Sequence, residues 1–211
     1  MIELQNIGLA FEGKALFDDL NVKVPEGGRL LIKGPSGTGK TTLLRMLLGF
    51  VLPDKGDVLI DGERLTVDNV WQLRQKMAYV SQDIQIGRGT AEGFIKEILG
   101  FRNNRFLSYD RDKVKALLKD FQLDRDTLGK NLEDLSGGEL QRFTIIVTLL
   151  LNRKIFLLDE VTSALDQPLK ELIADYFSNL KDKTLIISSH DAIWHEQDFT
   201  TLNLSSNGRS S

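Results

Sequence analysis

The chain has 211 residues, of which 41% are hydrophobic and 27% are charged, and its formal net charge is −3. This length suits one domain, or one core with an inserted lobe, and the acidic balance gives no electrostatic reason to expect nucleic-acid binding. The sequence contains no cysteine, which excludes disulfides and thiolate metal sites.

The first sixty residues predict a β-rich region. Short apolar runs at residues 2–7, 21–24, 29–33 and 57–60 are typical of strands, and turn residues such as Asp61-Gly62 separate them. The run at residues 29–33 is of the kind that forms a buried parallel strand. It leads directly into a glycine-rich loop, after which residues 42–48 read as a helix.

This glycine-rich loop has the pattern of a phosphate-binding loop. Glycine leaves the backbone N–H groups free to turn toward an anion, and the start of the following helix adds a partial positive charge. Lys40 supplies a charge for the β- and γ-phosphates, and the Thr41 hydroxyl suits Mg²⁺. The alternative is a glycine-rich turn with no ligand, which the flanking strand and helix argue against. The predicted nucleotide-binding residues of the loop are Gly34, Pro35, Ser36, Gly37, Thr38, Gly39, Lys40, Thr41 and Thr42.

The middle of the chain changes in character. A short strand at residues 77–81 ends at Gln82, and helical apolar spacing then follows at residues 92–99 and 111–121. We therefore predict a helical lobe at about residues 83–135, inserted into a core formed by residues 1–82 and 136–204. The polar tail, residues 205–211, is predicted to be disordered.

The last third of the chain alternates between helices and strands. Helical patterns at residues 138–151 and 167–180 alternate with strand patterns at residues 155–158 and 184–189. This alternation predicts an α/β fold with a parallel sheet. The densest apolar run, at residues 143–151, is too short to span a bilayer, which needs about 20 residues. If the protein works at a membrane, another chain has to carry it there.

Carboxylates follow one predicted strand and a histidine follows another. Asp159 and Glu160 come directly after residues 155–158, and His190 comes directly after residues 184–189. Ligands of open α/β sheets bind at this end of the strands. Asp159 is the expected Mg²⁺ partner through the water shell of the metal, and Glu160 could polarise an attacking water. Without a phosphate loop nearby, an ordinary acidic turn and a structural histidine would be the simpler interpretations.

Leu135-Ser136-Gly137-Gly138-Glu139 stands about 20 residues ahead of Asp159-Glu160. With this motif, the chain resembles the ATP-binding-cassette ATPases over almost its whole length. The resemblance implies a P-loop ATPase core in which Ser136, Gly137 and Gly138 bind the γ-phosphate of ATP held by an opposing subunit. A plain helix-capping turn is compatible with this role, because Ser136 can cap the helix as well.

The resemblance also assigns roles to other residues. Glu160, His190 and Gln82 correspond to catalytic positions, and Gln82 joins Thr41 and Asp159 around Mg²⁺. Phe11 falls where an aromatic residue stacks on adenine, and phenylalanine keeps the stacking face of the more usual tyrosine. The segment at residues 163–166 corresponds to a loop that crosses the dimer interface. Glu139 in place of the frequent glutamine, and Val161 in place of a frequent proline, remove no phosphate or metal ligand.

The function implied by the resemblance is an ATPase subunit of an ABC transporter, with ATP and Mg²⁺ as its ligands. Its partners would be an integral membrane permease and a second ATPase subunit, with which it would form a homodimer on ATP binding, and no nucleic acid is expected. Its location would be cytoplasmic, on the inner face of the cell membrane. The segment at residues 128–135 has a faint similarity to small ATPases of putative metal (iron) exporters.

Two other classes stay open. A cassette ATPase of DNA repair, chromosome organisation or translation shares these motifs, although no sustained heptads separate the phosphate loop from the signature. A nucleotide kinase shares the phosphate loop alone, and the signature and His190 argue against it.

Overall fold

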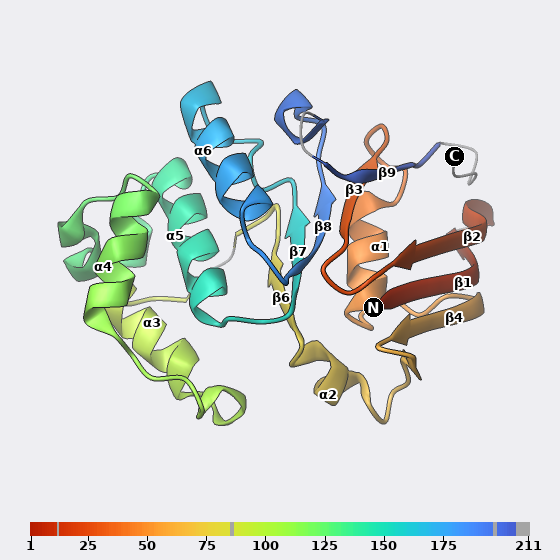
Figure 1. The fold of residues 1–211 in the computed structure, drawn as a ribbon, viewed down its shortest axis with the longest axis horizontal. Helices are drawn as coiled ribbons and strands as arrows, with labels where there is room; N and C mark the ends of the chain where they lie inside the picture. The colour runs from red at the N-terminus through yellow and green to blue at the C-terminus, as the bar shows by residue number, and fades with distance from the viewer. Residues whose placement is uncertain (12, 85–86, 196–197, 206–211) are drawn as a thin grey trace.

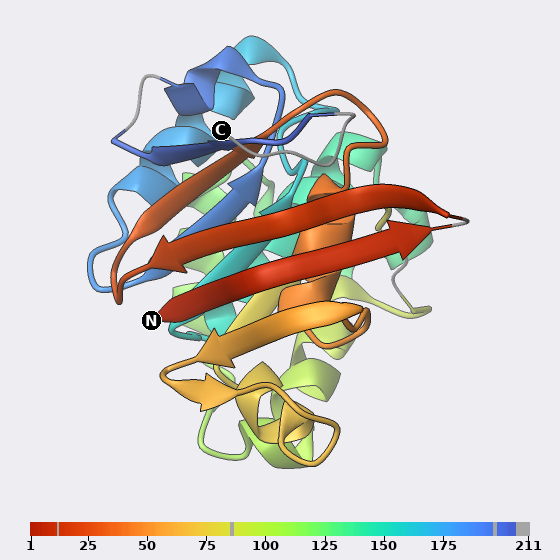
Figure 2. The same ribbon diagram turned by 90° about the vertical axis from the view of Figure 1, so that its right-hand side faces the viewer.

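Two β-sheets enclose helix α1 (Lys40–Leu47). The computed structural model describes residues 1–11, 13–84, 87–195 and 198–205. Figures 1 and 2 show α1 between an antiparallel sheet and a parallel sheet. Leu43, Leu44 and Leu47 of this helix are buried against apolar residues of both sheets. The helix that follows the glycine-rich loop is therefore packed on two sides, which fixes the position of its N-terminus.

The antiparallel sheet forms the outer layer, in the order β2-β1-β4-β5. Its first two strands are the longest of the described chain and pair through a register that shifts at several points. Along β1 the residues Ile2, Leu4 and Ile7 face the core. The strands are β1 (Ile2–Phe11), β2 (Lys14–Val24), β4 (Lys55–Ile60) and β5 (Glu63–Arg64).

The parallel sheet has the order β6-β7-β8-β3-β9. All of its neighbouring strands run in the same direction. Every residue of β7 and β8 is buried, as expected for strands that are covered on both faces. The strands are β6 (Met77–Val80), β7 (Ile155–Asp159), β8 (Thr184–Ser188), β3 (Arg29–Lys33) and β9 (Thr200–Asn203).

Helices α3, α4, α5 and α6 pack beyond the parallel sheet, on the side away from the antiparallel sheet, whereas Leu73 of α2 packs in the core between the two sheets. Figure 1 shows α3, α4 and α5 grouped at the end of the molecule opposite to β1 and β2. The rings of Phe94 and Phe143 lie 6.3 Å apart and join α3 to α5. The helices are α2 (Val70–Arg74), α3 (Ala91–Gly100), α4 (Arg111–Asp120), α5 (Gly137–Leu150) and α6 (Gln167–Ser178), and 3-10 helices lie at Arg102–Asn104, Arg125–Gly129, Leu132–Asp134 and Ala192–His195.

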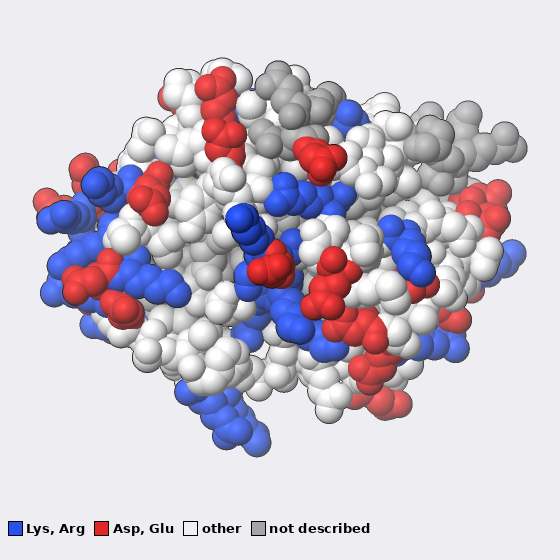
Figure 3. All heavy atoms as spheres, viewed as in Figure 1, with Lys and Arg blue, Asp and Glu red and all other residues white. Residues whose placement is uncertain are grey.

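Side chains cap the starts of most of these longer helices. The side chain of Thr90 caps α3, that of Asp110 caps α4, and that of Asp166 caps α6, each by accepting backbone N–H groups of the first turn. No helix in the described part of the chain has the length and apolarity needed to span a bilayer. On the face drawn in Figure 3, lysine and arginine side chains are interspersed with aspartate and glutamate side chains.

The structure confirms the predicted α/β fold with a parallel sheet, and it changes several boundaries. β1 and β2 run several residues further than predicted, because their exposed sides carry polar residues that hide the strand pattern. β5, α2 and β9 were not predicted, since each is too short to show a period. The helices α3 and α4 lie within residues 83–135, while the division into core and lobe stays a prediction. In the predicted disordered tail, Ser205 is described and residues 206–211 lie outside the described residues.

Gly56 provides a test of how β1 and β4 fit together. It has a left-handed φ of 83°, and a Cβ there would lie 2.3 Å from the Gln5 carbonyl oxygen. Gly62 has a similar φ of 79° but has open space around it. We expect Gly62→Ala to cost about 1–2 kcal/mol of unfolding free energy from backbone strain alone. Gly56→Ala should cost about 2 kcal/mol more, because the chain also has to shift. Urea unfolding of both variants measures the difference, and equal losses would contradict the close contact.

Candidate active site

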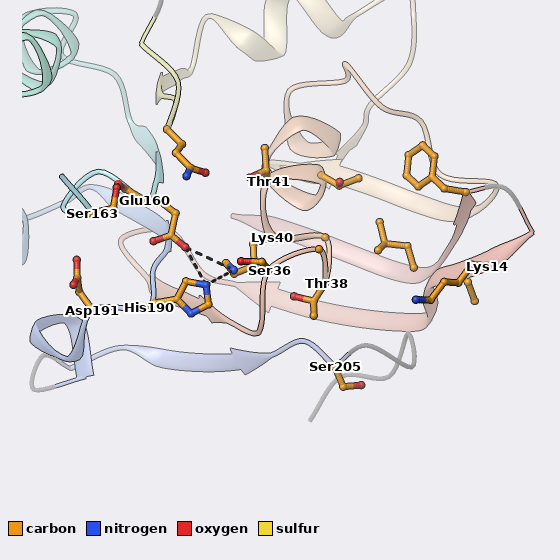
Figure 4. A pocket seen from close by; sticks show the side chains of 17 residues that line it. Lys14, Ser36, Thr38, Lys40, Thr41, Glu160, Ser163, His190, Asp191 and Ser205 are labelled. Atoms are coloured by element: carbon orange, nitrogen blue, oxygen red, sulfur yellow. Dashed lines mark hydrogen bonds and ion pairs between the residues drawn. The ribbon is translucent and has the colours of Figure 1, made fainter. Parts of the chain in front are cut away.

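A cavity of about 800 Å³ opens at the carboxyl ends of β3 and β8. Figure 4 shows that the side chains reach it from opposite sides, with Lys40 and Thr41 from the glycine-rich loop and helix and Glu160 and His190 from the strand ends. The residues that line it are Phe11, Lys14, Ala15, Leu16, Ser36, Gly37, Thr38, Gly39, Lys40, Thr41, Thr42, Gln82, Glu160, Ser163, His190, Asp191 and Ser205. The predicted phosphate loop and the predicted catalytic residues therefore share one cavity.

The glycine-rich loop folds around the Lys40 side chain. The Lys40 ammonium donates to the carbonyl oxygens of Gly34 at 2.8 Å and Pro35 at 3.4 Å. Gly39 immediately precedes α1 with φ 98°, and a Cβ there would lie 2.8 Å from the Phe17 ring. Glycine is thus required at position 39 both by the backbone conformation and by space. The loop holds a charged amine at the start of a helix, which is an arrangement suited to phosphate.

Lys40, Glu160 and His190 form a compact group. The Lys40 ammonium lies 2.7 Å from His190 Nε2 and 3.7 Å from Glu160 Oε1, and His190 Nε2 lies 3.5 Å from the same carboxylate oxygen. Because an ammonium can only donate, His190 Nε2 accepts and carries no proton in this arrangement. Lys40 and Glu160 are almost fully buried, whereas the His190 side chain is half exposed. One cation, one carboxylate and one imidazole therefore converge on a small volume.

Glu160 is held in a strained backbone conformation. Its φ is 51°, in the left-handed region that glutamate rarely adopts. The Glu160 N–H donates to the Ser188 carbonyl oxygen at 3.0 Å, and the Glu160 carbonyl oxygen accepts from the Ser163 hydroxyl at 2.8 Å. Strain of this kind persists where the surrounding contacts over-determine the geometry, and it concentrates at functional sites. These contacts turn the carboxylate toward Lys40 and away from the sheet.

Asp159 lies behind this group, fully buried at the end of β7. Its carboxylate accepts from the Ser188 hydroxyl at 2.5 Å and from the Tyr79 hydroxyl at 3.1 Å. Burial and, after it, the Asp159 carboxylate raise the pKa of Tyr79 well above its ordinary value, so this hydroxyl keeps its proton and donates it. Asp159 is not among the residues that line the cavity, whereas Thr41 and Gln82 are.

The chemistry of these donors fits Mg²⁺. A hydroxyl, an amide and a carboxylate provide the hard oxygen ligands that this cation prefers, and Mg²⁺ usually keeps several waters. The buried position of Asp159 suits contact through such a water rather than directly. Thr41, Gln82 and Asp159 are the residues that would hold the metal beside the phosphates.

A network that was missed in the sequence lies next to His190. The Asp191 carboxylate accepts from the Thr162 hydroxyl and from the Lys170 ammonium, each at 2.5 Å. The Trp194 indole N–H donates to the same Thr162 hydroxyl at 3.2 Å. Asp191 thereby ties the segment after β8 to the segment after β7 and to α6. An acidic residue directly after His190 was the available sequence signal.

The signature residues lie elsewhere. Ser136, Gly137 and Gly138 are at the N-terminus of α5, outside the cavity, and the first two are exposed. Ser136 and Glu139 form a reciprocal capping box, in which each side chain accepts the backbone N–H of the other. The backbone N–H of Ser136, its hydroxyl and then Lys130 lower the pKa of Glu139 to about 2. Within one copy of the chain, this helix start and the cavity are separate.

The remaining predicted ligands are placed as follows. Phe11 lines the cavity with Lys14 and Leu16 and is 52% exposed, so its ring is free to stack against a flat ligand. Ser36, Gly37, Thr38 and Thr42 line the cavity, and their binding of ATP stays a prediction. Gly34 and Pro35 do not line the cavity; their carbonyl oxygens accept hydrogen bonds from the Lys40 ammonium.

Comparisons with known proteins agree with this geometry. The family model described as "ABC transporter" matches residues 17–163. The chain is 31% identical to the "Probable iron export ATP-binding protein FetA" of Escherichia coli (strain K12), covering 96% of this chain and 91% of that protein. It is 30% identical to the "Fe(3+) ions import ATP-binding protein FbpC" of Escherichia coli O157:H7, covering 93% of this chain and 55% of that protein. The chain thus spans about half of FbpC, and about a third of another relative.

One solved structure, the "Dimeric Structure of MJ0796, a Bacterial ABC Transporter Cassette", is similar over the whole chain. The two folds agree with a TM-score of 0.85 at 26% identity, and the match covers 100% of this chain and 98% of that chain. The predicted P-loop ATPase core is confirmed by this similarity.

The Tyr79–Asp159 hydrogen bond allows the role of Asp159 to be tested. Tyr79→Phe should raise the Mg²⁺ concentration needed for half-maximal ATP binding by about tenfold, because it removes a group that orients the carboxylate predicted to hold the metal. It should also cost about 1–2 kcal/mol of unfolding free energy. Mg²⁺ titration with a fluorescent ATP analogue measures the first effect, and thermal unfolding measures the second.

Tyr109→Phe is the matched control. The Tyr109 hydroxyl donates to Glu92 at 2.8 Å, and neither residue lines the cavity. This variant should leave the Mg²⁺ requirement unchanged. If Tyr79→Phe and Tyr109→Phe needed the same Mg²⁺ concentration for ATP binding, the assignment of Asp159 to the metal site would be wrong.

Proposed function

Since the chain belongs to the ABC transporter family, we propose that it is the ATP-hydrolysing subunit of a transporter and drives a separate membrane permease. The observation that carries this proposal is the convergence of Lys40, Glu160 and His190 on one cavity. The cavity is built for the triphosphate of ATP, while the signature helix of the same copy points elsewhere. A second copy, placed head to tail, would supply Ser136 and Gly138 to the open side.

The phosphates are bound by the glycine-rich loop. On ATP binding, Lys40 exchanges its contacts with Gly34 and His190 for the β- and γ-phosphate oxygens, and the first N–H groups of α1 point at the same anion. Phe11 stacks on the adenine ring. Mg²⁺, when bound by Thr41, Gln82 and Asp159, neutralises charge on the β- and γ-phosphates.

Hydrolysis needs a base and a group that holds the γ-phosphate. Glu160 has the position for the base: its carboxylate is buried, fixed by its backbone and 3.5 Å from His190 Nε2. It orients a water for in-line attack, while His190 contacts the γ-phosphate. Most of the rate comes from positioning and from charge stabilisation by Lys40 and by the partner's helix start. Loss of the γ-phosphate removes the anion that joins the two copies, so the pair opens.

The permease requires a docking surface on this subunit. Phe50 and Trp71 are more than half exposed, and both rings lie against the Arg74 guanidinium, at 4.1 and 4.9 Å. Arg74 in turn donates to the Leu48 carbonyl oxygen at 2.5 Å, at the end of α1. The two aromatic side chains are thus held in place by the helix that begins at the phosphate loop. Rigid, exposed aromatic groups of this kind are suited to the apolar face of a permease helix.

The alternative docking candidates are three apolar residues that follow Gln82 in the chain: Ile84, Ile86 and Phe94. Phe94 is partly buried against Phe143 and belongs to the core. Ile84 is partly exposed, and Ile86 lies outside the described residues. We therefore place the first permease contact at Phe50 and Trp71. The subunit would work on the cytoplasmic face of the membrane, where ATP is available.

Iron is the first substrate to test. FetA is named for probable iron export and FbpC for Fe(3+) import, and FetA matches this chain over nearly its full length. The permease determines the direction of transport and the chemistry of the substrate site. Purification of the transporter with its permease, followed by metal transport into vesicles, tests this choice.

Replacement of the proposed base gives the most direct test of hydrolysis. Glu160→Gln should bind MgATP, form a stable ATP-dependent dimer and hydrolyse ATP at least about a hundredfold more slowly, because general-base catalysis contributes roughly 10²–10⁴-fold. Phosphate release and light scattering after size-exclusion chromatography measure the two properties. Glu171→Gln, on the exposed side of α6, is the control and should hydrolyse ATP normally. Wild-type turnover of Glu160→Gln would exclude Glu160 as the base.

The docking surface can be tested on the complex with the permease. Trp71→Ala should weaken binding to permease-containing vesicles by about tenfold, as expected for a central aromatic anchor. The ATPase rate of the isolated subunit should stay the same, since Trp71 does not line the cavity. Gln72→Ala, at the adjacent exposed position of α2, controls for effects on the helix. Equal vesicle binding by both variants would move the docking surface elsewhere.

A further inference from the structure

The hydroxyl of Ser136 is already engaged within its own subunit. It donates to Glu139 Oε2 at 2.8 Å, and the Ser136 backbone N–H donates to the same oxygen at 2.9 Å. The Glu139 backbone N–H donates to the Ser136 Oγ at 3.3 Å. A hydroxyl has one proton to donate. Binding of a phosphate by this hydroxyl therefore requires the proton to leave Glu139.

A cation stands on the other side of the same carboxylate. The Lys130 ammonium donates to Glu139 Oε1 at 3.2 Å. The backbone of Lys130 is fixed, because its N–H donates to Thr127 and its carbonyl oxygen accepts from Ala91 at the start of α3. The side chains of Lys130 and Glu139 are 39% and 26% exposed. The ammonium is thus presented to Glu139 from an anchored segment and is only partly screened by water.

We infer that Glu139 and Lys130 are positioning residues that set how strongly Ser136 binds the γ-phosphate across the dimer. Glu139 opposes this binding in two ways, since it competes for the hydroxyl proton and places a negative charge close to an incoming anion. Lys130 reduces both effects by neutralising the carboxylate. The inference rests on the proposed function, because it assumes that Ser136 faces the nucleotide of a second copy.

A purely structural role for Glu139 predicts a different result. If the carboxylate served only to cap α5, its loss would disorder the helix start and weaken phosphate binding. Glutamine separates the two cases, because its amide oxygen can still accept the Ser136 N–H while it carries no charge. Under our inference Glu139→Gln binds the opposing phosphate more tightly; under the capping role alone its phosphate binding stays the same, because the cap is kept.

The experiment uses Glu160→Gln as the parent, so that ATP is not consumed. The readout is the MgATP concentration at which half of the protein is dimeric, measured by analytical ultracentrifugation at low ionic strength. Adding Glu139→Gln should lower this concentration about threefold, and adding Lys130→Met should raise it about threefold, as expected for a partly exposed ion pair. Lys130→Arg should restore the parent value. With Glu139→Gln present, Lys130→Met should have little further effect.

Two controls separate this effect from folding and from nucleotide binding within one subunit. Thermal unfolding should show the variants folded, and affinity for a fluorescent ATP analogue under monomeric conditions should stay within about twofold, because Lys130 and Glu139 do not line the cavity. An unchanged or raised half-dimerisation concentration with Glu139→Gln would overturn the inference. The inference would also be overturned if Lys130→Met changed the half-dimerisation concentration equally with and without Glu139→Gln. If the parent itself stays monomeric with MgATP, the proposed function fails first, and the inference fails with it.

Discussion

The parallel register of three strands is the constraint on which the site depends. Ser188 at the end of β8 pairs with Asp159 of β7 on one side and with Ile32 of β3 on the other. The three strands therefore end at the same level, and the segments that leave them begin side by side. These segments carry the phosphate loop, Glu160 and His190. This register helps to bring residues that are more than a hundred positions apart in the chain within 4 Å of one another.

Hydrogen bonds at this level make the arrangement specific. The Ser188 hydroxyl donates to the Asp159 carboxylate, and the Ser188 carbonyl oxygen accepts from the Glu160 N–H. The Ser189 N–H donates to the Ile32 carbonyl oxygen. Asp191 continues the same edge by joining Thr162 and Lys170. These hydrogen bonds hold the turn that follows β7, in which Glu160 has its strained φ. A carboxylate aimed at Lys40 is the result.

Much of this could be predicted from the sequence because the motifs are local. The glycine-rich loop and the acidic pair after residues 155–158 each carry their chemistry within a few residues, and the strand and helix patterns around them give the fold. Long-range contacts gave no such signal. The Tyr79–Asp159 bond, the Asp191 network and the Phe50–Arg74–Trp71 group join residues by packing, and nothing in their spacing indicates a partner. Short elements such as α2 and β9 are held by their neighbours rather than by their own periodicity.

Glu139 shows how a local departure from a family pattern gains meaning in three dimensions. In the sequence it is a change at one position that removes no ligand. In the structure it is the residue that holds the Ser136 proton and is itself held by Lys130. Helix capping and anion binding use the same N–H and hydroxyl groups at the start of α5. In the proposed dimer, the contacts that cap the helix in one copy would therefore also set how strongly that helix start binds the phosphate held by the other copy.

The central claim is that each ATP is shared by two copies of the chain, and mixing two inactive variants tests it most directly. Lys40→Ala removes the phosphate contact of the cavity, and Ser136→Phe blocks the helix start that faces the partner. Each variant alone should hydrolyse ATP at background rate. A mixed dimer contains one site with both Lys40 and Ser136 intact, so mixing should restore activity, with a maximum near equal amounts. Continued inactivity of the mixture, or normal activity of Ser136→Phe alone, would show that ATP is hydrolysed within one copy.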